Sequence, residues 1–268
     1  MTRRENRVGY LLALPAILGF LVFYGLPFVL AVWNSFTLGA GGTLFIGLEN
    51  YRRIWGNTLF QLAAGNTALF MGTGIPAILV LSLLFALLLH KKFKGSRFVK
   101  LAFLFPMVVP AAATVMTLRI YLNGRTPGMA LLVVLYIWKN IGFDIVLLLA
   151  GLTMIPGEYY ESARLDGAGR WQSFCYITLP LLLPMLFLTF IISVLNAFKS
   201  FREAFLLAGE QPADNIYMLQ HFMNSNFQNL NYPRLCVAAI SCFLVIFVIL
   251  AVMYGGWRLR EKGGGRNE

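Results

Sequence analysis

The chain has 268 residues, of which 59% are hydrophobic and only 12% are charged, and its formal net charge is +11. Soluble domains carry about 25% charged residues, so this chain has too little polar surface to coat a water-soluble globule. The composition excludes a soluble protein, a disordered tail and a fibrous repeat. It indicates a polytopic membrane protein.

Six apolar runs are long enough to cross the hydrocarbon core of a bilayer, which takes a helix of about 20 residues. In chain order they cover residues 10–32, 67–89, 101–122, 129–151, 179–198 and 235–257. The runs are continuous and rich in Leu, Ala and Phe, without the alternation of barrel strands. We therefore expect an all-α membrane protein with six transmembrane helices, in which residues 1–268 form a single transmembrane domain.

Lysine and arginine are distributed unevenly between the segments that connect these runs. One set of segments consists of the two termini and the connections after the second and fourth runs. It holds more than twice as many lysines and arginines as the connections after the first, third and fifth runs. Positive residues accumulate on the cytoplasmic side, so both termini are expected to be cytoplasmic. Because the charges lie at span ends, we expect them to face the lipid bilayer, and we expect no nucleic-acid partner.

The chain lacks the residues that an enzyme would need. No Gly-x-x-x-x-Gly-Lys-Ser/Thr motif is present to hold nucleotide phosphates, and its two histidines, His90 and His221, lie on opposite sides in the predicted topology. No cluster with metal-ligand spacing occurs within a span. We therefore expect no catalytic residues, no metal and no cofactor, with energy for transport supplied by a partner or an ion gradient.

The most informative segment is the predicted cytoplasmic connection of residues 152–178. The Pro-Gly pair at residues 156–157 ends the fourth span. Glu158 and Glu161 follow it, and acidic residues favour the first turns of a helix because they complement its dipole. A short helix is therefore predicted to begin directly after the span.

That helix is interrupted by Gly167 and Gly169, because glycine tolerates the left-handed backbone that a sharp reversal needs. A second amphipathic stretch, residues 171–177, then runs into the fifth span. We expect two short helices at an angle, protruding from the membrane and able to enter a cleft of another protein. The alternative is an ordinary interfacial loop.

This connection resembles the motif of the inner-membrane permease subunits of binding-protein-dependent ABC importers. In that motif Glu-Ala-Ala is followed by three residues, Gly, nine residues and Ile-x-Leu-Pro. The matching residues are Glu161, Ser162, Ala163, Gly167, Ile177, Leu179 and Pro180, and Asp166 matches the sugar-importer version. Every spacing fits, and the one departure is Ser162, a small residue in place of alanine. We call residues 152–178 the coupling loop.

Further matches cover about residues 8–258 and resemble the first permease subunit of maltose and glycerol-3-phosphate importers. They include residues 10–15 and 24–27 in the first span, 45–51 in the first outer connection, Asn66-Thr67, and 138–156 around the fourth span. One departure is the outer connection 123–128, which is shorter than is usual in that group. It affects the expected docking surface for the binding protein and leaves the coupling loop intact.

The resemblance implies the ABC-importer permease fold of type I, in a multi-pass protein of the bacterial inner membrane. The chain would form half of the translocation path for a sugar, or a related polyol or oligosaccharide, delivered by an extracytoplasmic binding protein. Its implied partners are a second six-span permease subunit and two ATPase subunits or domains, which would bind and hydrolyse ATP-Mg. In the coupling loop, Glu161 would anchor to a basic residue of the ATPase, Ser162 and Ala163 would allow close approach, and Gly167 would form the hinge turn.

Polar residues within spans are costly and usually face a cavity or another helix, so they are candidates for the solute path. The candidates are Arg119, Lys139, Asn140, Asp144, Ser193 and Asn196. Asn140 and Asp144 are four residues apart and share one helix face. They would bond sugar hydroxyls, with Trp138 or Phe198 as a stacking surface. In the alternative interpretation, Lys139 and Asp144 are structural and pair with the second permease subunit or extend to the interface.

Two other functions are compatible with a six-span chain. One is a stand-alone secondary transporter or channel, which would need an internal repeat or a coupling-ion site, and we find neither in the sequence. The other is a membrane scaffold or interaction protein, in which the coupling loop would dock a partner without solute flow. The permease subunit is the function that the motif favours.

Overall fold

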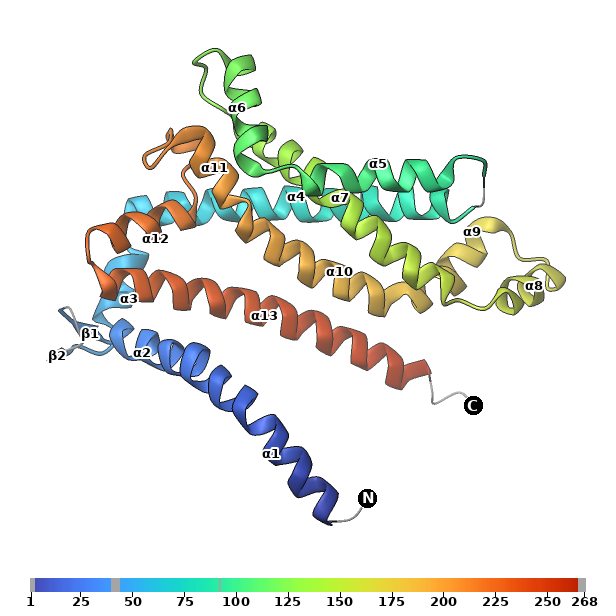
Figure 1. Cartoon of the computed structure of the whole chain (residues 1–268), viewed down its shortest axis with the longest axis horizontal. Helices are drawn as coiled ribbons and strands as arrows, with labels where there is room; N and C mark the ends of the chain where they lie inside the picture. The colour runs from blue at the N-terminus through green and yellow to red at the C-terminus, as the bar shows by residue number, and fades with distance from the viewer. Residues whose placement is uncertain (1–2, 40–43, 92, 265–268) are drawn as a thin grey trace. The chain divides into compact units, whose positions relative to one another are not determined.

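The computed structural model describes residues 3–39, 44–91 and 93–264, most of them in helices (Figure 1). Lys92 and Arg266, which contribute to the predicted cytoplasmic charge, lie outside the described residues. The chain divides into two compact units, and each is described separately. The first contains residues up to 61 together with 222–247, and the second contains residues 62–221 and those from 248 onward.

The first unit begins with one continuous helical segment that contains the predicted span 10–32. Its parts are α1 (Arg3–Phe20), a π-helical turn (Leu21–Gly25) and α2 (Leu26–Ser35). After it, β1 (Thr37–Leu38) pairs antiparallel with β2 (Leu44–Phe45), with Thr37 opposite Phe45. Helix α3 (Glu49–Trp55) follows. The unit is completed by the segments of α12 (Leu219–Gln228) and α13 (Tyr232–Gly264) that lie within residues 222–247.

Buried polar contacts close the first outer connection onto the end of α2. The Asn50 side-chain amide donates to the carbonyls of Ser35 and Thr37, at 3.1 and 2.7 Å, and the Tyr51 and Ser35 hydroxyls are hydrogen-bonded at 2.8 Å. The Trp55 indole donates to the Ser241 hydroxyl, which joins α3 to α13. The residues 45–51 that carried part of the family resemblance therefore fix this connection in place.

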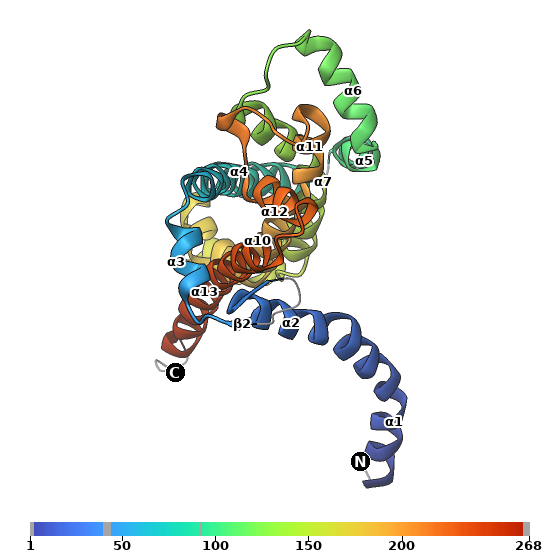
Figure 2. The same cartoon turned by 90° about the vertical axis from the view of Figure 1, so that its left-hand side faces the viewer.

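The second unit is built around α7 (Met129–Thr153), which packs against α5 (Ser96–Val108) and α10 (Leu179–Lys199) (Figures 1 and 2). The other helices of this unit are most of α4 (Thr58–His90), α6 (Ala111–Leu122), α8 (Gly157–Leu165), α9 (Arg170–Ser173), α11 (Phe201–Ala208) and the C-terminal part of α13. A π-helical turn over Phe174–Thr178 joins α9 to α10, and a short 3-10 turn covers Asp214–Ile216.

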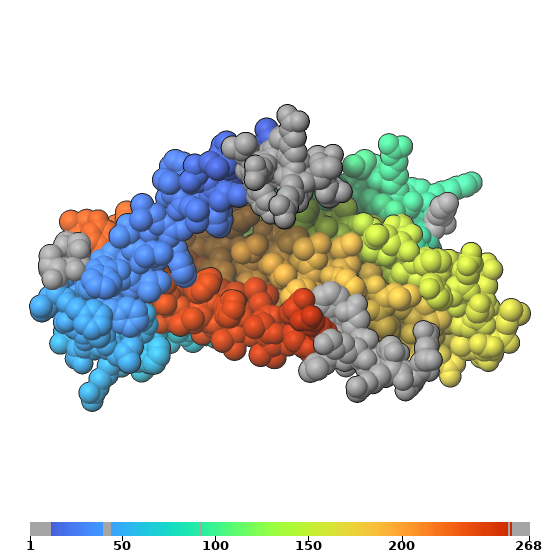
Figure 3. All heavy atoms as spheres, turned by 90° about the horizontal axis from the view of Figure 1, so that it is seen from below, coloured from blue at the N-terminus to red at the C-terminus, as the bar shows by residue number. Residues whose placement is uncertain are grey.

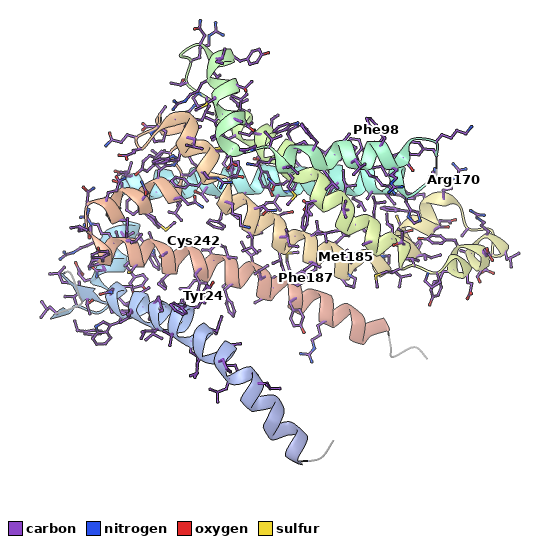
Figure 4. The ribbon with its side chains drawn as sticks, viewed as in Figure 1. Tyr24, Phe98, Arg170, Met185, Phe187 and Cys242 are labelled. Atoms are coloured by element: carbon purple, nitrogen blue, oxygen red, sulfur yellow. The ribbon has the colours of Figure 1, made fainter. Side chains whose placement is uncertain are left out.

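Two glycines allow the close approach of α7 to its neighbours. A Cβ atom at Gly142 would collide with the backbone carbonyl of Phe103 in α5. A Cβ at Gly151 would lie 2.7 Å from Leu182 Cδ1 and 3.0 Å from the Cβ of Met185 in α10, which is labelled in Figure 4. Small residues at contacts are the usual means by which membrane helices pack, because lipid provides no hydrophobic drive for their association.

The third predicted span, residues 101–122, is not one straight helix. Helices α5 and α6 meet at an angle of 86°, and α6 turns away from the axis of α5 (Figures 1 and 2). The break lies at Val109 and Pro110, whose backbones are extended, with ψ of 126° and 138°. Proline disfavours helical backbone in the residue before it, so Val109 ends α5. Apolar composition alone does not reveal such a break.

The other predicted spans lie within single helical segments. Residues 67–89 lie in α4, 129–151 in α7, 179–198 in α10 and 235–257 in α13. Among the described residues, five helical segments are long and apolar enough to cross a membrane, and six if the bent pair α5–α6 counts as one span. Several helices extend beyond the apolar runs, because the polar residues that flank these runs are also helical.

Candidate coupling and transport sites

The coupling loop begins with a short helix directly after α7. Pro156, with extended backbone, precedes α8, and Glu158 lies in the first turn of that helix. The helix ends at Leu165, and the left-handed Gly167 follows it, with φ of 79°. The Ala168 amide donates to the Ala163 carbonyl at 2.8 Å. This is the capping arrangement that glycine favours at helix C-termini. The predicted reversal at Gly167 is therefore present in the structure.

The second half of the coupling loop continues into α10. The Gly169 amide donates to the side-chain oxygen of Gln172 at 2.7 Å, which caps α9. From Arg170, labelled in Figure 4, the backbone runs as a continuous helix through α9 and the π-helical turn into α10. The Tyr160 and Thr178 hydroxyls are hydrogen-bonded at 2.9 Å and tie α8 to the base of α10. A force on α8 would thus reach α10 through a direct contact.

The coupling loop is exposed and carries large apolar side chains. Leu165 is 90% exposed, Tyr176 81% and Trp171 74%. Figure 3 shows the side chains of α8 and α9, in yellow-green and yellow, on the surface of this unit. The motif residues Glu161, Ser162, Asp166, Gly167 and Pro180 are also exposed, whereas Ala163, Ile177 and Leu179 are half-buried. Apolar side chains grouped on an exposed loop are typical of a surface that binds another protein.

Gly167→Ala is expected to destabilise the turn after α8. No atom lies within 4 Å of a Cβ at this position, so the effect comes from the left-handed backbone, which costs a non-glycine residue about 1–2 kcal/mol. Amide hydrogen exchange across residues 157–173 should become faster. Gly157→Ala is the matched control, because its backbone is not left-handed and its Cβ also meets no neighbour. Unchanged exchange in Gly167→Ala would contradict the proposed capping.

Lys139 forms an ion pair within the chain. Its ammonium group contacts the carboxylate of Glu203 in α11, and the two side chains are only 14% and 6% exposed. The exposed Arg202 lies farther from the same carboxylate, at 3.9 Å. The sequence analysis did not single out Glu203. The sequence does offer one indication of its role. Glu203 follows shortly after the apolar run 179–198, which contains no acidic residue.

Asp144 is fully buried between α7 and α10. Its Oδ2 accepts a hydrogen bond from the Ser193 hydroxyl at 2.9 Å, and its Oδ1 has no hydrogen-bond partner among the described residues. The Tyr136 hydroxyl donates to the Ser193 carbonyl at 2.9 Å, and the Asn140 amide donates to the Tyr136 carbonyl at 2.8 Å. These bonds form one polar network along the α7–α10 contact.

The remaining solute-path candidates are more accessible. Asn140, Asn196 and Phe198 are half-buried, and Trp138 is exposed. Arg119 lies elsewhere, on the exposed side of α6, where its Nε donates to the Leu207 carbonyl at 3.4 Å. The structure thus brings Lys139, Asp144 and Ser193 into intramolecular contacts and leaves the two asparagines with accessible surface. Among the described residues, no group of three or more His, Cys, Asp or Glu could hold a metal ion.

The Asn66-Thr67 pair anchors the segment that leads into α12. The Asn66 amide donates to the carbonyls of Asp214 and Tyr217, at 2.6 and 2.9 Å, and the Thr67 hydroxyl accepts from the Leu219 amide at 2.8 Å. His221 completes the cap, because its Nδ1 accepts from the Met218 amide at 3.1 Å. Two residues of α4 therefore hold an outer connection more than 140 residues away in sequence.

Acidification is expected to loosen this outer connection. Burial lowers the pKa of His221 from 6.5 to about 4, because the protonated ring would lose its hydration. Protonation would also remove the acceptor that the Met218 amide uses. The stabilisation is fully present above about pH 6.5 and is lost as the pH falls from about 6.5 to 4. Thermal unfolding measured between pH 7.5 and 4.5 should show this loss. In His221→Gln, thermal stability should change less between about pH 6.5 and 4, because the glutamine side-chain oxygen can accept the Met218 hydrogen bond at any pH.

Known proteins are similar to this chain in sequence and in fold. Residues 78–258 match the family described as binding-protein-dependent transport system inner membrane component. The trehalose/maltose transport system permease protein MalF of Thermococcus litoralis is 30% identical, over 95% of this chain and 96% of that protein. The arabinooligosaccharides transport system permease protein AraP of Bacillus subtilis is 29% identical, over 91% of this chain and 85% of that protein.

A solved structure has the same arrangement of helices. It is a bacterial ABC transporter involved in the import of the acidic polysaccharide alginate, with a TM-score of 0.77, 23% identity, and coverage of 95% of this chain and 96% of that one. The predicted all-α fold of an importer permease is thereby confirmed. With the family model spanning most of the sequence, and with the exposed coupling loop inside the matched region, the chain belongs to the binding-protein-dependent transport system inner membrane components.

Proposed function

We propose that this chain is the permease subunit of an ATP-driven importer and forms half of the translocation path for a sugar, a polyol or an oligosaccharide. The relatives support a carbohydrate substrate, since one is a trehalose/maltose permease and another an arabinooligosaccharide permease. The partners in this proposal are a second permease subunit, two ATPase subunits that bind ATP-Mg, and an extracytoplasmic binding protein. Hydrolysis takes place on the ATPases.

The observation that carries this proposal is the exposed coupling loop. Glu161 lies exposed on α8, one turn from the exposed side chain of Leu165. A carboxylate beside an apolar side chain offers an ATPase both a charge partner and a hydrophobic contact. Because the Tyr160–Thr178 hydrogen bond joins α8 to the base of α10, closure of the ATPases would move α10, and α7 with it, as rigid levers.

Each motif residue has a place in this mechanism. Glu161 and Asp166 supply negative charge to the contact with the ATPase. Ser162 and Ala163 have small side chains, which let the ATPase surface approach the backbone of α8 closely. Gly167 makes the reversal between α8 and α9. Ile177 and Leu179 are half-buried where the loop enters α10, and Pro180 lies in the first turn of that helix, where its fixed backbone directs the chain into the span.

The polar network of α7 and α10 supports the solute path in the proposal. Asn140 and Asn196, which retain accessible surface, would contact sugar hydroxyls from this half of the path. Lys139, Asp144 and Ser193 would hold α7, α10 and α11 in register behind them, because their polar groups are engaged within the chain. A path residue needs accessible surface, and both asparagines are half-buried rather than buried.

Affinity purification tests the proposed assembly. The tagged chain is extracted from its native membrane in mild detergent, and the proteins that accompany it are identified by mass spectrometry. A second six-span permease and an ATPase with a phosphate-binding loop are expected, with less ATPase recovered from Glu161→Lys. Recovery of the chain alone, together with solute flux in vesicles without ATP, would contradict the proposal and favour a secondary transporter.

A further inference from the structure

A groove of about 400 Å³ lies in the second unit, between the connection 123–128 and the segment that follows α11. Its apolar lining includes Leu207 and Ile216, and its polar lining consists of Arg119, Arg125, Thr126 and Gln211. In the predicted topology both connections are on the outer side of the membrane. Residues 124–127 of the short connection line one part of the groove.

The two arginines are held by the local fold. Arg119 lies in the last turn of α6, and its Nε donates to the Leu207 carbonyl, which leaves its terminal nitrogens for another acceptor. Arg125 follows two residues with left-handed backbone, Asn123 and Gly124, and the Arg125 amide donates to the Leu122 carbonyl at 2.9 Å. The chain thus reverses tightly at the end of α6, and both guanidinium groups line the same groove.

The chemistry of the lining selects a carboxylate. The groove contains two guanidinium groups and no acidic side chain, and the neighbouring Glu210 does not line it. Guanidinium groups bind carboxylates through paired hydrogen bonds. A neutral sugar is a poorer fit, because no aromatic ring in the lining offers a stacking surface and there are few acceptors for its hydroxyl protons.

We infer that this arginine groove, defined by Arg119 and Arg125, docks an acidic side chain of the extracytoplasmic binding protein. The inference rests on the proposed function, because it requires an importer that receives its solute from such a protein. The family is binding-protein-dependent, and a solved permease of the same fold is known in complex with a periplasmic protein. Charged groups at the rim of an interface mainly raise the association rate and make it sensitive to salt.

The test uses the complete importer in lipid nanodiscs and follows ATP hydrolysis as the binding protein is titrated. Arg119→Gln with Arg125→Gln should raise the half-saturating concentration of binding protein about tenfold and remove most of its salt dependence. The basal ATPase rate and the maximal stimulated rate should stay unchanged. Arg52→Gln is the matched control, since Arg52 is exposed on the same predicted side and lies outside the groove.

A charge exchange makes the test specific. The variant Arg119→Glu with Arg125→Glu should dock poorly to the native binding protein and recover with one in which an acidic surface residue is replaced by lysine. An unchanged half-saturating concentration in the glutamine variant would overturn the inference. So would a change confined to the KM for acidic sugars, which would place the sugar itself in the groove. If the native importer shows no stimulation by any binding protein, the proposed function fails instead.

Discussion

Lys139→Met is expected to destabilise the second unit by about 3–5 kcal/mol, the usual cost of removing one partner of a buried ion pair. The effect arises because Glu203 is only 6% exposed and would lose its nearest cation. The exposed Arg202, at 3.9 Å, is too distant to replace it fully. Thermal unfolding of the purified complex, compared with the native complex, measures the loss.

Two variants separate charge from packing in this prediction. Lys139→Met combined with Glu203→Gln should recover most of the stability, because no uncompensated buried charge remains. Lys199→Met, at the exposed end of α10, should change stability by less than about 0.5 kcal/mol. If Lys139→Met were as stable as the native protein, the ion pair would have no structural role. Lys139 would then again be a candidate for contact with the solute.

Gly142→Ala is expected to disrupt the contact between α5 and α7. The added methyl group would occupy the position of the Phe103 carbonyl, and a backbone atom cannot move aside as a side chain can. Overpacking of this kind costs about 1–3 kcal/mol, in spite of the better helix propensity of alanine. Lower thermal stability and a reduced transport rate should appear together, because α7 carries the proposed solute-path residue Asn140.

Gly72→Ala provides the control for the glycine prediction. Gly72 lies in α4, and no atom outside its own helix is within 4 Å of the added Cβ, so alanine should leave stability unchanged or raise it slightly. Equal stability of the two variants would show that the helices separate at Gly142 without cost. In that case the close approach of α5 and α7 would not be a requirement of the fold.

The spans could be predicted from sequence because their signal is local. About 20 consecutive apolar residues leave few alternatives to a membrane helix, and the predicted runs at 67–89, 129–151 and 179–198 lie inside α4, α7 and α10. The reversal of the coupling loop could also be predicted from sequence, because a glycine such as Gly167 locally favours a left-handed turn. The role of this loop in coupling stays a prediction from the spacing of the motif.

The contacts within the spans could not be predicted, because they join residues that are distant in sequence. Lys139 and Glu203 are 64 residues apart, and Asp144 and Ser193 are 49 apart. A polar residue in an apolar run indicates that a partner is needed but does not identify it. The same limit applies to the 86° bend between α5 and α6, since a proline in an apolar run is compatible with a kink of any size.

The most direct test of the coupling mechanism compares Glu161→Lys with Glu158→Lys in the reconstituted importer. Both variants reverse an exposed acidic charge on α8, and only Glu161 belongs to the motif. ATP-dependent solute uptake is measured in proteoliposomes that contain an excess of binding protein. We expect Glu161→Lys to abolish uptake, because two like charges would then face each other across the ATPase contact, and Glu158→Lys to retain most of it. Uptake at the native rate in Glu161→Lys would contradict the assignment of this loop as the coupling element.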